Sequence, residues 1–194
     1  QETYLSAFNV FVPYGSSNVD FSSVLASSNL STLQLQSLFT LAAGSNGLAS
    51  VTGPQGYGTR QFLPADQALP YTVRFQNPST APTSVTEVRI AQQLDASLNL
   101  RTFRLGDIKL GDATVHIPTG RSTYQGDIDL TQSRGFILRV SAGVDPTSAT
   151  ASWVLQAIDP ESGEVLVDAT RGLLRPDDAQ GQGAGFVSYT IAPK

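Results

Sequence analysis

The stretch Leu69–Leu100, LPYTVRFQNPSTAPTSVTEVRIAQQLDASLNL, decides the fold because it holds two strand patterns with a turn between them. In Leu69–Gln76, apolar and polar side chains alternate, which is the period-2 pattern of a strand with one buried face. Pro78 and Pro82 then stop regular pairing, because proline lacks the N–H that a sheet ladder needs. The second alternating run has an apolar face made of Val88, Ile90 and Leu94. Two such strands and their turn form half of a β-sandwich.

Alternating runs recur along the rest of the chain, so roughly nine or ten short strands and no long helix are expected. The further predicted strands are Thr102–Leu110, Thr114–Ile117, Tyr124–Leu130, Phe136–Val144, Ser152–Ile158 and Phe186–Ala192. Gly106-Asp107 and Gly111-Asp112 are expected to break the first two of these, and Asp159–Gly163 to form a hairpin turn. The predicted class is all-β, with an Ig-like antiparallel β-sandwich. Its predicted core consists of Val73, Phe75, Val88, Ile90, Ile128, Leu138, Val140, Trp153 and Val187.

The composition limits the partners and favours one compartment. A net charge of −4 without basic clusters argues against nucleic acid and anionic lipid, since both require a basic patch. No apolar run is long enough for a transmembrane helix, so membrane insertion is not expected. The chain has no Cys or Met, and it begins at Gln1, as a mature protein does after signal cleavage and as a trimmed chain or a proteolytic fragment also does. These features favour an extracellular or cell-surface location.

The first fifty residues differ from the rest, because residues 1–50 contain no Lys or Arg. We call this segment the N-terminal arm and expect a sandwich domain over residues 51–194, with the turn-rich Gly53–Gly58 at the boundary. Thr3–Tyr14 reads as a strand that is apolar on both faces and therefore needs cover on both sides. It is either the first strand of its own sandwich or a strand donated to a neighbouring subunit's sheet. Its candidate strand-donation residues are Tyr4, Leu5, Phe8, Val10, Phe11 and Val12.

Few residues suggest a catalytic, metal-binding or glycosylation site. His116 is the single histidine, and no nucleophile motif or set of zinc ligands accompanies it, so an enzyme is not expected and no cofactor is implied. Asp127 and Asp129 project from one face of a strand, as a glycosidase pair, a calcium site or the solvent side of a strand would. A calcium site is considered at Asp177 and Asp178, before a Gly-rich loop. Asn29 begins an Asn-Leu-Ser sequon, which has meaning only in a secreted protein.

From about Val51 to Lys194 the chain resembles the Ig-like conserved repeat domains of large secreted and cell-surface proteins of bacteria and archaea. The resemblance rests on Gly53–Gly58, on the TVRFQN…VTEVRI…LDASL string of the opening stretch, on Ile158–Glu164 and on Gly185–Ile191. It implies an Ig-like scaffold outside the cell, without a shared active site. The family often has an Asp-rich entry before its Gly-Pro, where this chain has LASVT, and this argues against an ion site there.

Two functions follow as expectations. The first is a structural subunit of an extracellular filament or surface layer, which forms a homopolymer when the N-terminal arm adds a strand to a neighbouring subunit. The alternative is a non-catalytic Ig-like module of a large secreted adhesin, with calcium as a candidate stabilising ion. The expected partner is therefore a second copy of the chain, and cell-surface or glycan ligands are considered beside it.

Overall fold

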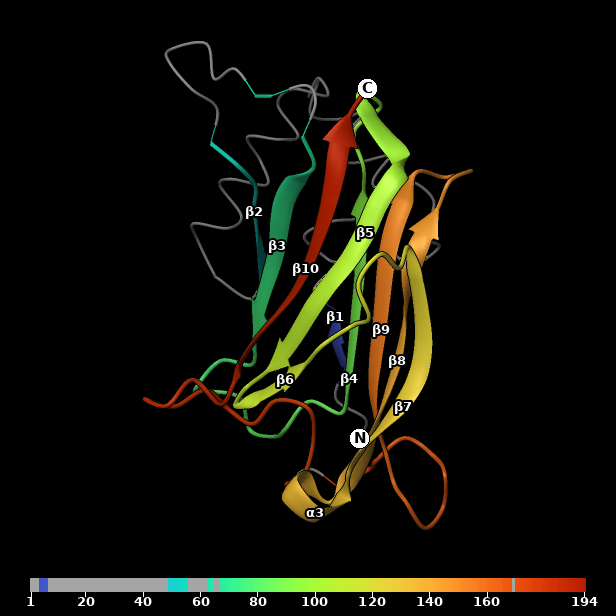
Figure 1. Ribbon diagram of the computed structural model, residues 1–194. Helices are drawn as coiled ribbons and strands as arrows, with labels where there is room; N and C mark the ends of the chain where they lie inside the picture. The colour runs from blue at the N-terminus through green and yellow to red at the C-terminus, as the bar shows by residue number, and fades with distance from the viewer. Residues whose placement is uncertain (1–3, 7–48, 56–62, 65–66, 169) are drawn as a thin grey trace, which may run out of the picture.

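A computed structural model describes residues 4–6, 49–55, 63–64, 67–168 and 170–194 of the 194-residue chain. The protein is nearly all β, and its strands form two sheets that pack face to face (Figure 1). In sheet A the strands run in the order β1 (Tyr4–Ser6), β4 (Glu87–Gln93), β9 (Thr150–Ile158), β8 (Phe136–Asp145) and β7 (Thr123–Leu130). In sheet B they run in the order β2 (Ala49–Thr52), β3 (Leu69–Gln76), β10 (Ala184–Pro193), β5 (Leu98–Leu110) and β6 (Ala113–Val115).

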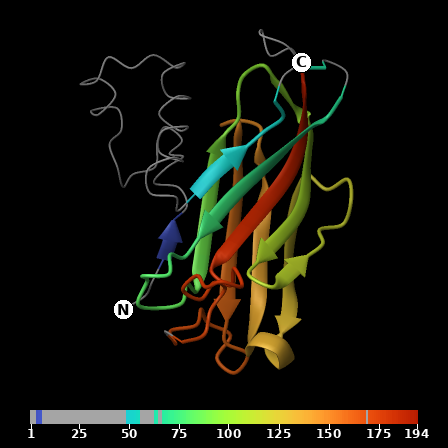
Figure 2. The same ribbon diagram turned by 90° about the vertical axis from the view of Figure 1, so that its left-hand side faces the viewer.

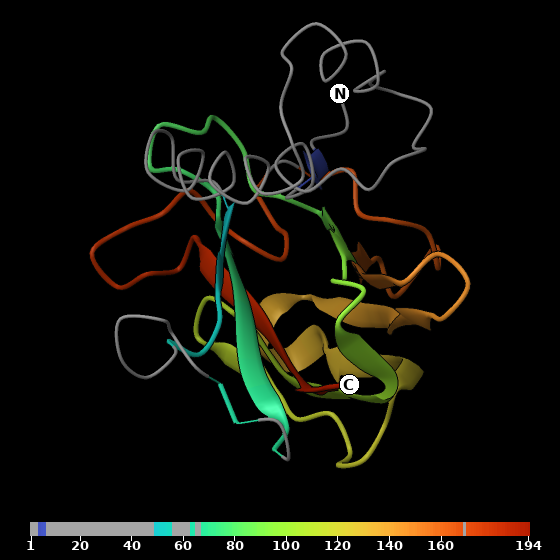
Figure 3. The same cartoon turned by 90° about the horizontal axis from the view of Figure 1, so that it is seen from above.

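The predicted all-β sandwich is confirmed, and neighbouring strands pair antiparallel everywhere except between β1 and β4. Strand β3 has the bounds predicted from its alternation, Leu69–Gln76. The turn after β3 carries the chain to the opposite sheet, so β3 and β4 face each other across the core instead of pairing. In Figure 2 the strands β2, β3 and β10 of sheet B lie in front of sheet A, and the two sets cross at an angle. Figure 3 shows the two layers from above.

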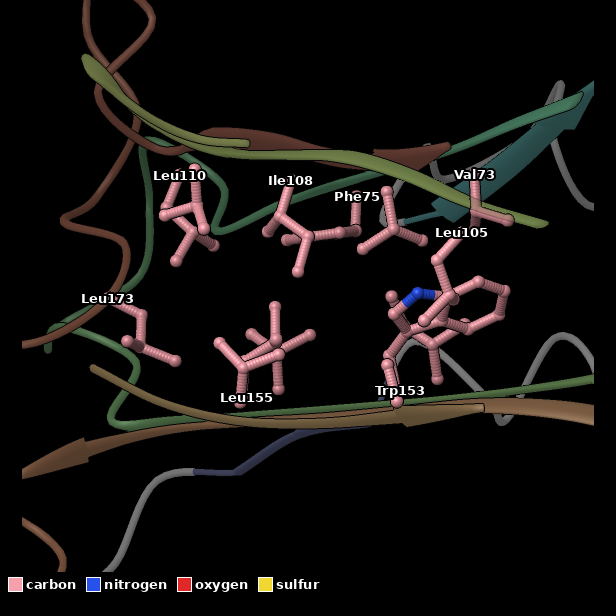
Figure 4. Packing of buried hydrophobic residues seen from close by; sticks show 14 of the residues in the cluster. Val73, Phe75, Leu105, Ile108, Leu110, Trp153, Leu155 and Leu173 are labelled. Atoms are coloured by element: carbon pink, nitrogen blue, oxygen red, sulfur yellow. The ribbon is translucent and has the colours of Figure 1, made fainter. Parts of the chain in front are cut away.

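The core lies between the sheets. Figure 4 shows Val73, Phe75, Ile108 and Leu110 pointing from sheet B toward Leu155 and Trp153 of sheet A. Of the nine residues predicted for the core, all except Ile128 are buried. Ile128 is only partly buried because β7 is the last strand of sheet A, and side chains of an edge strand have cover on one side only. At one end of the core the rings of four aromatic residues contact one another, namely Tyr71, Phe103, Trp153 and Tyr189.

The predicted break at Gly106-Asp107 is wrong, since β5 runs through both residues without interruption. The pairing of β5 with β10 shifts register here. Val187 lies opposite Ile108 and Tyr189 lies opposite Leu105, so an advance of three residues on β5 matches an advance of two on β10. This is a β-bulge, which adds a residue to one strand without ending it. A Cβ at Gly106 would come within 2.5 Å of the Ser188 hydroxyl oxygen, and glycine avoids this clash.

The break predicted at Gly111-Asp112 is confirmed, because these two residues form the turn between β5 and β6. Gly111 has a φ of +59°, in the left-handed region that favours glycine. A single helical turn, α3 (Thr131–Arg134), joins β7 to β8 at the lower end of the sandwich in Figure 1.

Two loops meet at this lower end around Asn77, which is 3% exposed. Its backbone N–H donates to the carbonyl of Gly183 at 2.8 Å, and its own carbonyl accepts from the N–H of Asp177 at 2.9 Å. Its side-chain amide donates to the carbonyls of Thr83 at 2.9 Å and Leu174 at 3.3 Å. The backbone and side chain of this one buried residue thus connect the loop after β3 to the loop that precedes β10.

Candidate assembly interface

The edge of β4 is where the sandwich accepts a strand from a distant part of the sequence. On one side β4 pairs with β9 along its whole length, from Glu87 to Gln93. On the other side β1 pairs with it in parallel over three residues only, with Tyr4 opposite Glu87, Leu5 opposite Val88 and Ser6 opposite Arg89. Figures 1 and 2 show the short arrow of β1 beside this edge. Within the described part of the chain, no strand pairs with the remaining edge residues, 90–93.

A parallel partner at this edge cannot arise from a tight hairpin, because two parallel strands need a long crossover between them. Strand β1 therefore joins the edge of β4 from a distant part of the chain and does not form a hairpin with β4. The unpaired N–H and C=O groups of an edge strand favour further pairing with any suitable extended segment. The edge of β4 consequently has the chemistry of a strand acceptor.

An acidic side chain marks the place where β1 joins. Glu87 projects from the outer face of sheet A, opposite Gln156 of β9, yet it is only 2% exposed. Gln156 and Arg89 both donate hydrogen bonds to its carboxylate. The bond to Glu87 raises the pKa of Arg89 above its ordinary value, so this guanidinium stays charged. Gln156 lies on β9, on one side of β4, whereas Tyr4 of β1 lies opposite Glu87 on the other side.

The residues predicted for strand donation are only partly described. Tyr4 and Leu5 lie in β1, which pairs with β4 of the same chain, as expected for the first strand of its own sandwich. Phe8, Val10, Phe11 and Val12 lie outside the described residues, as does the sequon at Asn29. Strand β2 begins at Ala49 and pairs with β3 through Thr52. Sheet B therefore includes the last two residues of the segment that we named the N-terminal arm.

The isolated histidine lies on the surface. His116 follows β6, its side chain is 77% exposed, and its Nδ1 atom is 3.1 Å from Oδ1 of Asp107. This contact joins β5 to the segment after β6 on the outer side of sheet B.

The paired carboxylates on β7 have different partners in the fold. Asp127 receives two hydrogen bonds of 2.9 Å from Arg139, its register partner on β8, and the guanidinium lowers the pKa of this carboxyl group. Asp129 instead accepts hydrogen bonds from the backbone and hydroxyl of Thr131 at the start of α3. Both carboxylates thus already bind neighbouring protein groups.

The candidate calcium ligands also face their own loop. Asp177 accepts a hydrogen bond from the N–H of Gly183 at 3.0 Å. Asp178 accepts from the N–H groups of Gln180 and Gln182 at 3.0 and 3.1 Å. Among the residues that the structure describes, no cluster of three or more His, Cys, Asp or Glu side chains is placed to hold a metal ion.

One feature was not anticipated from the sequence, a surface hollow of about 400 Å³ on sheet B. Arg74, Phe186 and Lys109 line it from three adjacent strands. They lie far apart in the sequence, and only the pairing of β3, β10 and β5 brings them together. Each of them occupies a polar-face position of its strand, but alternation within one strand does not reveal its neighbours in the next.

The fold defines the class of the protein, an all-β sandwich, and its described residues form two five-stranded sheets. Comparison with protein-family models, with curated proteins and with solved structures gives no match for this chain. Within the described residues, no helix combines the length and the apolar character needed to span a membrane.

Proposed function

We propose that this protein is a structural subunit of an extracellular filament or surface layer, in which the N-terminal strand of one subunit adds to the edge of β4 in the next. The observation that carries the proposal is the pairing of Tyr4–Ser6 with Glu87–Arg89, in parallel and at the edge of a sheet. A strand that joins a sheet edge in this way uses backbone hydrogen bonds, which a second copy of the chain offers in the same geometry.

Strand β1 can exchange between copies of the chain at little cost in free energy. A net contribution of about 1 kcal/mol for each backbone hydrogen bond means that three paired residues hold β1 weakly in its own subunit. The same bonds re-form when β1 pairs with β4 of another copy, so exchange costs little in hydrogen bonding. If each subunit donates its strand to the next, the contact is heterologous and generates an open chain of subunits.

The sequence supports the same reading through Thr3–Tyr14. This segment is apolar on both strand faces, and it lacks the Lys residues that usually discourage pairing at strand edges. Burial of one large apolar side chain contributes about 1.5–3 kcal/mol, so cover from a second subunit would favour assembly. The resemblance to Ig-like repeat domains of secreted and cell-surface proteins, and the absence of Cys and Met, support the extracellular location.

Cysteine cross-linking tests the proposal directly, because the natural chain contains no cysteine. We would prepare one variant with Ser6→Cys and another with Arg89→Cys, which replace residues that lie opposite each other in β1 and β4. When the two single variants are mixed and oxidised, strand donation predicts a disulfide-linked dimer. The double variant should give a ladder of cross-linked species that disappears on reduction.

A matched control is Gln125→Cys on β7, an exposed position at the opposite edge of sheet A. This variant should not cross-link efficiently to the Ser6→Cys variant. Deletion of residues 1–14 should leave a folded β protein that no longer assembles, as judged by circular dichroism and electron microscopy. The proposal fails if the double variant forms only an internal disulfide and sizes as a monomer, a result that favours the adhesin module, or if the truncated chain still polymerises.

A further inference from the structure

Four residues form a row across the outer face of sheet B. Ser50 on β2 lies opposite Arg74 on β3, Arg74 lies opposite Phe186 on β10, and Phe186 lies opposite Lys109 on β5. Adjacent strands are about 4.8 Å apart, so the Cα atoms of Arg74 and Lys109 are about 10 Å apart, with the phenyl group between them. The row therefore presents one aromatic ring between two cations.

This row forms the floor of the surface hollow on sheet B. Gln76 and the turn at Gln180-Gly181 line the same hollow of about 400 Å³. The N–H of Gly181 donates to the carbonyl of Asp178 at 3.0 Å, which closes the turn. The Oδ1 atom of Asp178 accepts hydrogen bonds from the backbone N–H groups of Gln180 and Gln182 within this loop.

The two cations lack acidic partners in the described part of the chain. Neither Arg74 nor Lys109 forms an ion pair or a side-chain hydrogen bond there. Arg139 and Arg171, in contrast, bind neighbouring aspartates. In a protein of net charge −4, two unpaired cations beside one hollow form a local site for a negatively charged ligand.

We propose that this hollow binds an acidic polysaccharide through the carboxylate of a uronic acid residue. The Arg74 guanidinium can hold a carboxylate with two parallel hydrogen bonds, and Lys109 adds a second positive charge. The ring of Phe186 offers a flat apolar surface to the C–H face of a sugar, and the amides of Gln76 and Gln180 offer hydrogen bonds to its hydroxyl groups.

A polysaccharide fits this site better than an acidic peptide does. Peptides that add to sheets do so at an open edge, through backbone hydrogen bonds. Strand β10 pairs with β3 on one side and with β5 on the other, so its backbone is already engaged. The site consequently offers side chains alone, and these match a ligand that carries carboxylates, hydroxyls and an apolar ring face.

Isothermal titration calorimetry of oligogalacturonate binding to the full chain, at low salt, tests this proposal. The natural chain should bind it, and neutral maltooligosaccharide should not bind. Arg74→Gln and Lys109→Gln should each weaken binding about tenfold or more, because each removes a charge-assisted contact. Phe186→Ala should weaken it as well. The control Arg121→Gln changes the net charge equally at an exposed position outside the hollow and should leave the affinity unchanged.

The outcomes separate the alternatives. Absence of oligogalacturonate binding by the natural chain, or equal loss in Arg121→Gln and Arg74→Gln, overturns the proposal. Equal or tighter binding of polyglutamate would assign the site to an acidic peptide and also overturn it. Thermal unfolding of each variant shows whether the sandwich is intact. The hollow lies on sheet B and the acceptor edge on sheet A, so each proposal can fail while the other holds.

Discussion

The side-chain amide of Gln156 donates a hydrogen bond to the carboxylate of Glu87, across β9 and β4 and on the outer face of sheet A. Glu87 is only 2% exposed, although the outer face of an antiparallel sheet is usually solvated. A buried carboxylate is tolerated only when donors satisfy it, and here Arg89 is the second donor. The pair therefore stabilises β4 at the point where β1 is added.

Replacement of Glu87 by Ala should lower the free energy of unfolding by about 1–3 kcal/mol, because the partly buried amide of Gln156 loses its acceptor. Urea denaturation measures the change. Gln125→Ala, on the exposed face of β7, serves as the control and should change stability by about 0.5 kcal/mol or less. An equally small effect of Glu87→Ala would contradict a structural role for this carboxylate.

Asn77 should be the most sensitive polar position of the lower loops. Asn77→Ala removes the two side-chain hydrogen bonds to backbone carbonyls and should lower the free energy of unfolding by about 1–3 kcal/mol. Asn77→Asp should cost at least as much, since an ionised carboxylate cannot donate to these carbonyls. Urea denaturation and the rate of proteolysis near Asp177 measure both effects. If Asn77→Asp were as stable as the natural chain, the inferred hydrogen-bond directions would be wrong.

Gly185 on β10 should not tolerate a side chain. A Cβ there would lie 2.5 Å from a ring carbon of Phe75 and 2.8 Å from the backbone oxygen of Lys109. Gly185→Ala should therefore lower stability by about 1–3 kcal/mol, as overpacked core substitutions do. Gly143→Ala on β8 is the matched control, because its closest contact is a methyl group of Thr123 at 3.0 Å. Equal thermal stability of the two variants would show that Phe75 relaxes freely.

Acid should destabilise the loop that holds Asp168, Thr170 and Arg171, because Asp168 becomes protonated. The hydroxyl and N–H of Thr170 and the guanidinium of Arg171 bind this carboxylate and lower its pKa from 3.8 to about 2. A folded-state pKa below the unfolded value stabilises the protein above about pH 4, and this contribution is lost as the pH falls toward about 2. The difference in melting temperature between the natural chain and Asp168→Asn should therefore be constant above pH 5 and shrink toward pH 2. A difference independent of pH would exclude this linkage.

Local pattern predicted most of the strands that the structure contains, but not β2 (Ala49–Thr52). The alternation in Leu69–Gln76 located β3 and its buried residues Val73 and Phe75. This works because side chains on a strand alternate between faces, so one buried face imposes a period of two on the sequence. The positions of glycine predicted the ends of strands less well. Gly111 ends β5, whereas Gly106 lies in a bulge within it, and the two dipeptides Gly-Asp look alike in the sequence.

The sequence alone determined the all-β class, the alternating core and the unusual composition of residues 1–50, because each depends on neighbours along the chain. The tertiary structure decided which strands pair. It placed β3 and β4 in opposite sheets, joined β1 to β4, and brought Arg74, Phe186 and Lys109 into one row. These relationships depend on register between segments that are distant in the sequence. Strand pairing is selected by the packing of the whole core, and no single strand carries that information.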